Sequence, residues 1–395
     1  MSTTSNWCRC TSCHIGYGWK DASFDFSDPS KIDCLVCHDT TGTYKKIPTG
    51  CGKEKEDLNL VKIAQSVGPP TRANCGACHW YGGGGDAIKH GDLDSTLKDP
   101  PYSHDVHMGG EDFSCQECHV AHKHKISGSS TTSAVSEGSV SCTDCHDEKP
   151  HSDEHPLLKK LNDHCNSIAC QTCHIPTFAK AKPTLMFWDW SKAGKTMKVS
   201  QDDPYCITTH HKKKGLLIKK QNVRPDYAWY NGKHRQYLTG DSVNLDGITY
   251  LNSPVGDISD PKAKITPYKL FSGIQPADAK YEYLIIPKLW GGYWKHFDWD
   301  RAARDGMKAA GLKYSGKIKF VNTKMYWRIN HEVVPKDQAL SCTNCHSYDG
   351  VMDFEALGYK DDPAIVGCRF TKRTDHKEKV PIKKLKPKFW RSKKN

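Results

Sequence analysis

Apolar and polar positions follow different patterns on the two sides of residue 175. Residues 8–174 are interrupted repeatedly by segments rich in Gly, Ser, Asp and Pro, such as 80–86 (WYGGGGD) and 127–139 (SGSSTTSAVSEGS). Such segments cannot form long helices or sheets. We therefore expect short helices joined by irregular backbone in residues 1–175.

Residues 176–341 have more regular patterning. Apolar and polar residues alternate in 215–220 (GLLIKK) and 235–240 (RQYLTG), which predicts paired strands. Residues 300–311 (DRAARDGMKAAG) combine helix-forming residues with a terminal Gly, which predicts a helix. The segment is also rich in Trp, Tyr and Lys. We expect it to form a structural cap, and the alternative is that it forms one wall of a functional site.

Composition limits what can fill the core. Of 395 residues only 37% are hydrophobic, and the mean hydropathy is -0.69. A core made of aliphatic side chains would be thin for a chain of this length. The chain also contains 19 Cys and 21 His, so a cofactor bound by these residues could supply the missing apolar surface.

The motif Cys-x-x-Cys-His occurs seven times. A random arrangement of the same residues would give roughly 0.05 such motifs. Neither zinc ribbons nor disulfide scaffolds require a His after every second Cys, whereas covalent haem attachment uses both thiols and the adjacent imidazole. We therefore predict seven haem c groups. The motifs are Cys10-Cys13-His14, Cys34-Cys37-His38, Cys75-Cys78-His79, Cys115-Cys118-His119, Cys142-Cys145-His146, Cys170-Cys173-His174 and Cys342-Cys345-His346.

The second axial position of each iron determines its role. A second His gives an electron carrier, and an open position gives a substrate site. The His residues outside the motifs supply the candidates, although each could equally be a surface or hydrogen-bonded His. We select His90, His107, His122, His124, His151, His155, His164 and His331, and expect His210, His211 and His376 to be exposed beside lysines.

Five cysteines lie outside the motifs, namely Cys8, Cys51, Cys165, Cys206 and Cys368. None of them builds a further haem motif. We expect some of them to form disulfides in an oxidising compartment. Because their number is odd, at least one is left free or pairs outside this chain.

The formal charge of +12 would ordinarily suggest a nucleic-acid partner. Haem propionates offer a simpler explanation, because the excess of Lys and Arg can neutralise them, so we expect no nucleic acid. The basic run at 379–394 is predicted to be a solvated tail. No stretch approaches 18 apolar residues, so we expect no transmembrane segment. Residues 1–20 lack the apolar core of a signal peptide, yet haem c is attached outside the bacterial cytoplasm. We expect a periplasmic protein whose leader lies outside the given sequence.

Beyond the motifs themselves, the surrounding segments resemble the octahaem tetrathionate reductase family of multihaem c-type cytochromes. The resemblance extends from Cys10 to about Tyr359 and includes the spacers. It is carried by RCTSCHIGYGWKD, DCLVCHDTTGTYKK, RANCGACHWYGGGGDAIKHGDLDSTL, DVHMGGEDFSCQECH, ACQTCHIPTFAK, WDWSKAGK and MYWRINHEVV. That family is related to hydroxylamine oxidoreductase and pentahaem nitrite reductase.

The resemblance implies a mainly α fold with extensive irregular loops and a few short strands, wrapped around a haem cluster. The positions of the motifs and the shift in composition divide the chain into a haem-dense region (1–175), a haem-free insert (176–341), and the last motif with the basic tail (342–395). The resemblance implies an eighth motif upstream of Cys10, so this chain is expected to be either a truncated form or a seven-haem relative.

The resemblance also implies a reductase of tetrathionate, nitrite or hydroxylamine at one haem with a lysine ligand. By this resemblance the catalytic haem is the one at His14, and Lys20 is the candidate ligand; the alternative is that Lys20 is a surface residue beside Asp21. The other six haems would have two His ligands. Implied partners are a redox-partner cytochrome or a quinol-linked donor, with a small inorganic anion as substrate. A non-catalytic electron conduit with every haem six-coordinate is the second hypothesis.

Overall fold

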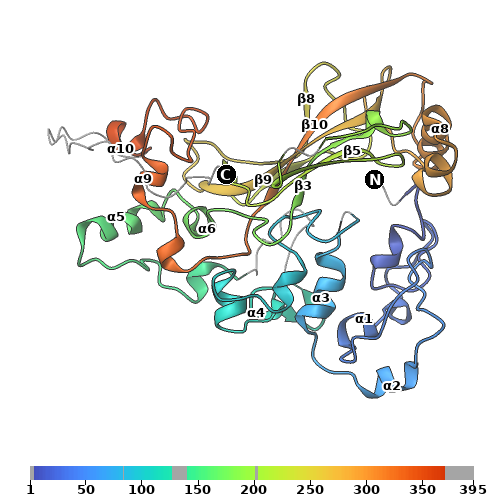
Figure 1. The fold of residues 1–395 in the computed structure, drawn as a ribbon, viewed down its shortest axis with the longest axis horizontal. Helices are drawn as coiled ribbons and strands as arrows, with labels where there is room; N and C mark the ends of the chain where they lie inside the picture. Colours follow the sequence, from blue (N-terminus) through green and yellow to red (C-terminus); the bar gives the residue numbers. More distant parts are fainter. Residues whose placement is uncertain (1–3, 83, 127–139, 201–202, 370–395) are drawn as a thin grey trace.

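The computed structural model describes residues 4–82, 84–126, 140–200 and 203–369. A twisted β-sheet lies on one side of the molecule, and short helices and loops are spread beneath it (Figure 1). The predicted tail at 379–394, His376 and the loop at 127–139 fall outside the described residues.

The helices are short because the motifs are separated by turn-forming segments. Several begin at a side-chain cap; for example, Thr71 and Asn74 form a reciprocal capping box at the start of α3. The α-helices are α1 (Leu35–His38), α2 (Leu60–Gln65), α3 (Arg72–His79), α4 (Cys115–Cys118), α5 (Pro156–His164), α6 (Cys170–His174), α7 (Trp294–His296), α8 (Trp299–Ala309), α9 (Cys342–Cys345) and α10 (Pro363–Val366). Tighter or wider turns are η1 (Thr11–Cys13), η2 (Pro29–Lys31), η3 (Ser95–Lys98), η4 (Val106–Gly110), η5 (Cys142–Asp144), η6 (Trp190–Lys192), η7 (Leu289–Tyr293) and η8 (Lys336–Gln338).

Almost all of the strands form one sheet of eight, in the order β4-β5-β3-β9-β10-β8-β7, with β6 also paired to β9. The long antiparallel pair β9–β10 is its centre, and β3–β9 and β8–β10 are parallel pairs. A separate hairpin joins β1 and β2. The strands are β1 (Ala121–His122), β2 (Lys125–Ile126), β3 (Thr184–Asp189), β4 (Cys206–His211), β5 (Gly215–Lys220), β6 (Asp226–Tyr230), β7 (His234–Gln236), β8 (Ile248–Pro254), β9 (Lys264–Asp278) and β10 (Ile318–Arg328).

The predicted fold class is confirmed, and the local predictions hold in part. Strand β5 coincides with the alternating run 215–220, and α8 occupies most of 300–311. The run 235–240 contributes only its first two residues to β7. Strand β9 is longer than the short runs suggested, because its partners β3, β6 and β10 cover it and nearly every position is at least partly buried.

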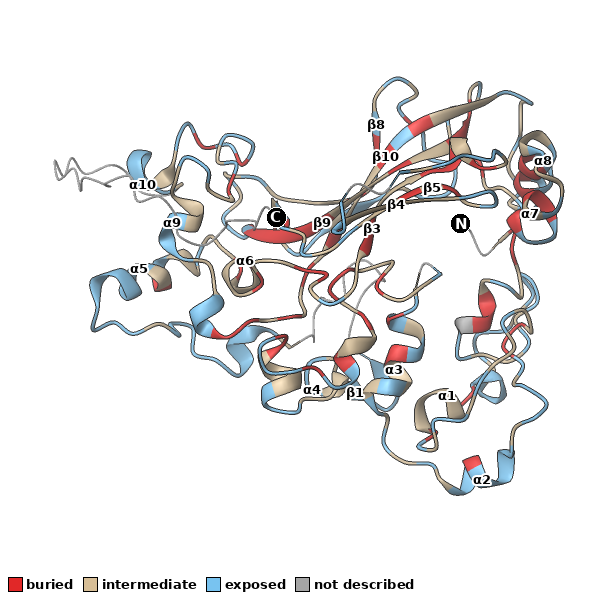
Figure 2. Ribbon diagram, in the orientation of Figure 1, coloured by how far each residue is buried: buried red, intermediate tan, exposed pale blue. Residues whose placement is uncertain are grey.

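Burial is concentrated in the sheet and around α8, whereas most residues of the motif helices are half-buried or exposed (Figure 2). Helices α1, α4 and α9 bury no residue at all. The described apolar clusters are small and separate, and each contains residues of the segment 175–359. Among the described residues, none of these clusters therefore lies wholly within the haem-dense region.

Two further features concern the chain's surroundings. Cys8 and Cys51 form a disulfide, which joins η1 to the loop before α2, while Cys165 and Cys206 are not in disulfides. None of the described helices combines the length and apolarity needed to cross a bilayer.

Candidate functional site

The five-residue motifs fold as single turns. In four motifs the backbone N–H of the His donates to the backbone carbonyl of the first Cys, at 2.8 to 3.0 Å. These are the motifs of His38, His119, His146 and His346. Because one α-turn brings residues i and i+4 onto the same side, this bond places the His over the first Cys. The first motif is different, since the His14 N–H donates to Thr11 at 3.2 Å in a tighter turn.

Five of the seven motif histidines face a second imidazole from elsewhere in the chain. The ring centroids are 6.1 to 6.4 Å apart. Two imidazole nitrogens that bind one metal from opposite sides, each at about 2 Å, put the ring centres about 6 Å apart. The spacing therefore fits one iron between each pair. The pairs are His38 with His124, His146 with His107, His119 with His331, His174 with His151, and His346 with His164.

Hydrogen bonds at Nδ1 orient four of these rings. His38 Nδ1 lies 2.8 Å from the Gly68 carbonyl, and His151 Nδ1 lies 3.2 Å from the Asn162 side-chain oxygen. His331 and His346 bond the carboxylates of Asp92 and Asp362, at 3.0 and 2.6 Å. A donor bond at Nδ1 leaves Nε2 unprotonated in the neutral ring, which is the form that binds a metal.

The hairpin β1–β2 presents His124 in a strained turn. Lys123 and His124 both have left-handed backbone, with φ of 49° and 64°. Such conformations cost free energy in non-glycine residues and persist where the surroundings require them. His122, two residues earlier, is exposed and faces no motif histidine among the described residues.

Replacing His124 by Ala is expected to remove one axial ligand from the haem at His38 and to convert one low-spin ferric signal into a high-spin signal. The matched replacement His122→Ala should leave the spectrum unchanged. Electron paramagnetic resonance of the two purified holo-variants measures this difference. Equal spectra would contradict the pairing of His38 with His124.

Cysteines of successive motifs also lie close together. The thiols of Cys75 and Cys115 are hydrogen-bonded, and so are those of Cys142 and Cys170. Burial and then the charge of Cys173 raise the pKa of Cys345 to about 12, so these two motifs are also neighbours. Cofactors attached at these cysteines would follow one another as a continuous series.

The His79 site departs from this pattern. No second imidazole lies at the pair distance from His79 among the described residues. Burial lowers the pKa of His79, and the next largest cause is the charge of Lys89. The Lys89 ammonium lies 5.2 Å from the centre of the buried Trp327 ring. Lys89 is therefore close enough to His79 for its charge to act on the imidazole.

The loop that carries Lys89 is fixed from several directions. The Ala87 N–H donates to Trp80 at the end of α3, and Thr184 Oγ1 donates to the Ala87 carbonyl at 2.6 Å. The fully buried Lys269 donates from Nζ to the carbonyls of Ile88 and Lys89, at 3.0 and 2.9 Å. These bonds hold the Lys89 backbone against the sheet.

No contact between Lys20 and His14 is found among the described residues. Lys20 is exposed, and it lies beside Asp21, whose pKa is lowered mainly by hydrogen bonds from Ser23 and slightly by Lys20. The His14 ring instead has Trp19 edge-on at 4.3 Å. No second imidazole is paired with His14 in the described part of the chain.

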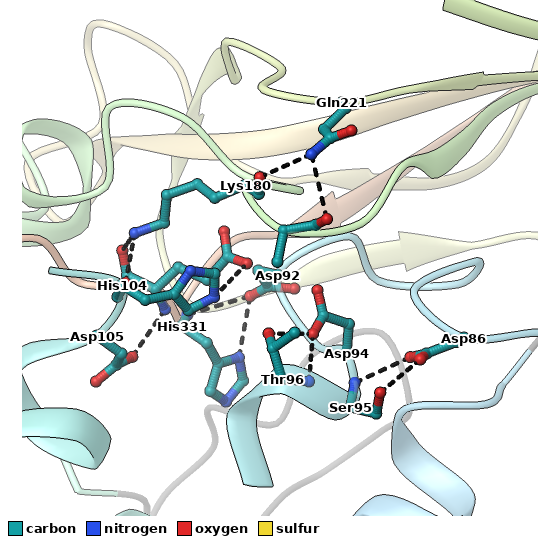
Figure 3. A network of polar contacts seen from close by, with 12 residues as sticks. Asp86, Asp92, Asp94, Ser95, Thr96, His104, Asp105, Lys180, Gln221 and His331 are labelled. Carbon is teal, nitrogen blue, oxygen red and sulfur yellow. Dashed lines mark hydrogen bonds and ion pairs between the residues drawn. The ribbon is translucent and has the colours of Figure 1, made fainter. Parts of the chain in front are cut away.

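A buried polar network includes Asp92 and His331 (Figure 3). Asp92 accepts from the N–H groups of Asn330 and His331 and from His331 Nδ1. Despite burial, which raises it, the hydrogen bond and charge of His331 hold the pKa of Asp92 at about 2. Next to it, the buried Glu332 lies 3.2 Å from His104 Nε2. The loop of Lys89 and the ligand His331 are thus tied together.

The remaining selected histidines have other contacts. His90 packs edge-on against Trp327 at 5.0 Å, and His155 accepts from the Leu157 N–H at the start of α5. His210 is half-buried, with Nε2 3.0 Å from the Lys192 carbonyl, whereas His211 is exposed. Sequence reasoning selected His90 but missed its neighbour Lys89; the position of Lys89 shortly after a motif was the only available signal.

Comparisons with known proteins agree with this geometry. Residues 185–349 match the family model described as bacterial cytochrome c. A crystal structure of octaheme cytochrome c from Shewanella oneidensis superposes with a TM-score of 0.84 and is 50% identical, covering 92% of this chain and 83% of that chain. An uncharacterized protein of Archaeoglobus fulgidus is 26% identical over 148 residues, which are 33% of this chain and 50% of that protein. The chain thus spans half the length of this curated relative.

Proposed function

Because the chain belongs to the octahaem cytochrome c family, we propose that it is a periplasmic reductase in which Lys89 is the axial ligand of the catalytic haem, the one at His79. The observation that carries this proposal is the break in the pattern of ligands. Five described motif histidines face an imidazole, and His79 has Lys89 beside it instead. Lys20 at His14 is the less supported alternative.

The residues around His79 suit a covalently held haem. Helix α3 supplies two thiols that would attach the haem and one imidazole that would bind its iron. The haem would supply electrons to an oxidised substrate, and a coordination position would be open to that substrate when the Lys89 amine is released. A lysine binds a metal only through its neutral amine, and burial lowers the pKa of Lys89, which favours that form. Lys269 holds the loop in place.

The substrates we propose are tetrathionate, nitrite and hydroxylamine. The ammonium of Lys269 would make the site positive, which favours the anions tetrathionate and nitrite, whereas hydroxylamine is neutral. Burial lowers the pKa of Lys269 to about 7, so it can lose its proton near neutrality. The bis-His sites would act as the electron supply, and seven haem c groups would be attached in all. The donor would be another cytochrome or a quinol-linked protein.

The experiment that tests this proposal uses the holo-protein with a reduced viologen as donor. Each of the three substrates is added separately, and the oxidation of the dye is followed. We expect substrate-dependent oxidation, together with a ferric resonance signal distinct from those of bis-His haems. If only bis-His signals appear and no substrate accelerates the reaction, the protein is an electron conduit. Mass measurement of the intact protein counts the haems.

A further inference from the structure

A group of buried polar atoms without partners in the described structure lies on the sheet. The Nε and Nη1 nitrogens of Arg328, the Tyr268 hydroxyl and His234 Nε2 are all buried and lack hydrogen-bond partners within the described structure. Buried polar groups are nearly always hydrogen-bonded, and an unpaired buried cation is especially unfavourable. We therefore expect this group of atoms to bind a ligand.

The sheet brings these atoms together around one ring. Arg328 is directly opposite Tyr268 in the β9–β10 register, so both side chains point to the same face. The Arg328 guanidinium lies 4.9 Å from the centre of the Tyr230 ring, the His234 ring lies 4.8 Å from it, and the Tyr268 ring 6.5 Å. Four strand segments, from β6, β7, β9 and β10, thus converge on one point.

The chemistry of the group favours an oxyanion. Arg328 offers unpaired N–H donors on Nε and Nη1 to an anion, and the Tyr268 hydroxyl offers another. Asn252 fixes His234, because its side-chain oxygen is 3.2 Å from His234 Nδ1 while its amide donates to the Tyr326 carbonyl at 3.1 Å. His234 Nε2 is then the atom left to meet a ligand, and as an imidazolium it would donate to an anion.

A haem propionate is an oxyanion that the protein's own cofactors would supply. Each covalent haem brings two propionates, and no described group is hydrogen-bonded to the unpaired atoms of Arg328, Tyr268 and His234. We infer that Arg328, Tyr268 and His234 form a binding site for one oxyanion, and that its occupant is a haem propionate. This assignment needs covalent haem and does not depend on the reductase activity.

Spectroelectrochemical titration of the holo-protein tests the assignment. A positive charge beside a haem stabilises its reduced form, so Arg328→Leu is expected to shift the midpoint of one haem to a more negative potential. Tyr268→Phe, which removes only the hydroxyl, should shift the same haem less and in the same direction. Arg235→Leu, which removes an exposed Arg from β7, is the matched control and should change nothing.

Added sodium sulfate, at constant ionic strength, separates the two sources of the oxyanion. With a propionate in the site the wild-type midpoints do not change with sulfate. If one midpoint changes and saturates with sulfate, and Arg328→Leu abolishes that response, the site holds a free anion. Midpoints that match the wild type in both variants, with no sulfate response, overturn the site. If Arg328→Leu fails to retain haem, Arg328→Lys should restore the haem content. The midpoint potentials of Tyr268→Phe then test the site, and potentials equal to those of the wild type overturn it.

Discussion

Replacing Lys89 by Leu is expected to remove one distinct ferric haem signal and to lower the rate of substrate reduction roughly 100-fold or more, since even indirect partners of a metal ligand are worth 10- to 100-fold. Leu fills a similar volume and cannot bind iron. The contact with Trp327 that is lost is worth only about 1 kcal/mol, so the fold should survive. Resonance spectra and initial rates of the holo-variant measure the two effects.

The matched control is Lys20→Leu, which changes an exposed lysine close to another motif. We expect wild-type spectra and rates from it. If Lys20→Leu loses the signal and Lys89→Leu keeps it, the catalytic haem is the one at His14. If both variants behave like the wild type, neither lysine is an axial ligand. Haem content, measured on each preparation, excludes incomplete maturation as the cause.

The motifs could be located from the sequence, because covalent attachment requires both thiols and the imidazole in one turn. The candidate second histidines could be selected, but their pairing with the motifs could not be predicted, since each pair joins distant segments. His107 and His331 lie far from His146 and His119 in sequence, and only the folded sheet and its loops bring them together. His122 and His124 look equivalent in the sequence AHKHK, and the strained turn distinguishes them.

In residues 176–341, too, local sequence patterns predicted some strands but not the contacts between distant segments. Alternation located β5, but Lys269 in the middle of β9 looks like a solvent-facing residue of a strand. It is fully buried because three acceptors converge on its ammonium, namely the carbonyls of Ile88 and Lys89 and the Thr184 hydroxyl. Those acceptors come from segments 85 to 181 residues away, which no local pattern encodes.

Asp92→Ala is expected to lower the free energy of unfolding by about 3 kcal/mol or more, the largest effect on stability that we predict. Hydrogen bonds to a charged group contribute about 1.5–3 kcal/mol each, and leaving buried donors unpaired costs further free energy. Asp92 accepts three, from the Asn330 N–H at 2.8 Å, the His331 N–H at 3.1 Å and His331 Nδ1 at 3.0 Å. Denaturant unfolding followed by circular dichroism measures the change.

Asp92→Ala should also change the spectrum of the haem at His119 and leave the spectra of the other haems unchanged. This result would distinguish a lost orientation of the His331 ring from a general loss of stability. Without Asp92 the His331 ring loses the bond that presents Nε2 toward His119, so the signal of that haem should become mixed between low and high spin. Asp112→Ala is the control, because the Asp112 side chain is 96% exposed and its ion pair with Arg72 is worth no more than about 1 kcal/mol. A variant Asp92→Ala that is as stable as Asp112→Ala, with an unchanged His119 haem, would mean that Asp92 does not connect the Lys89 loop to this ligand.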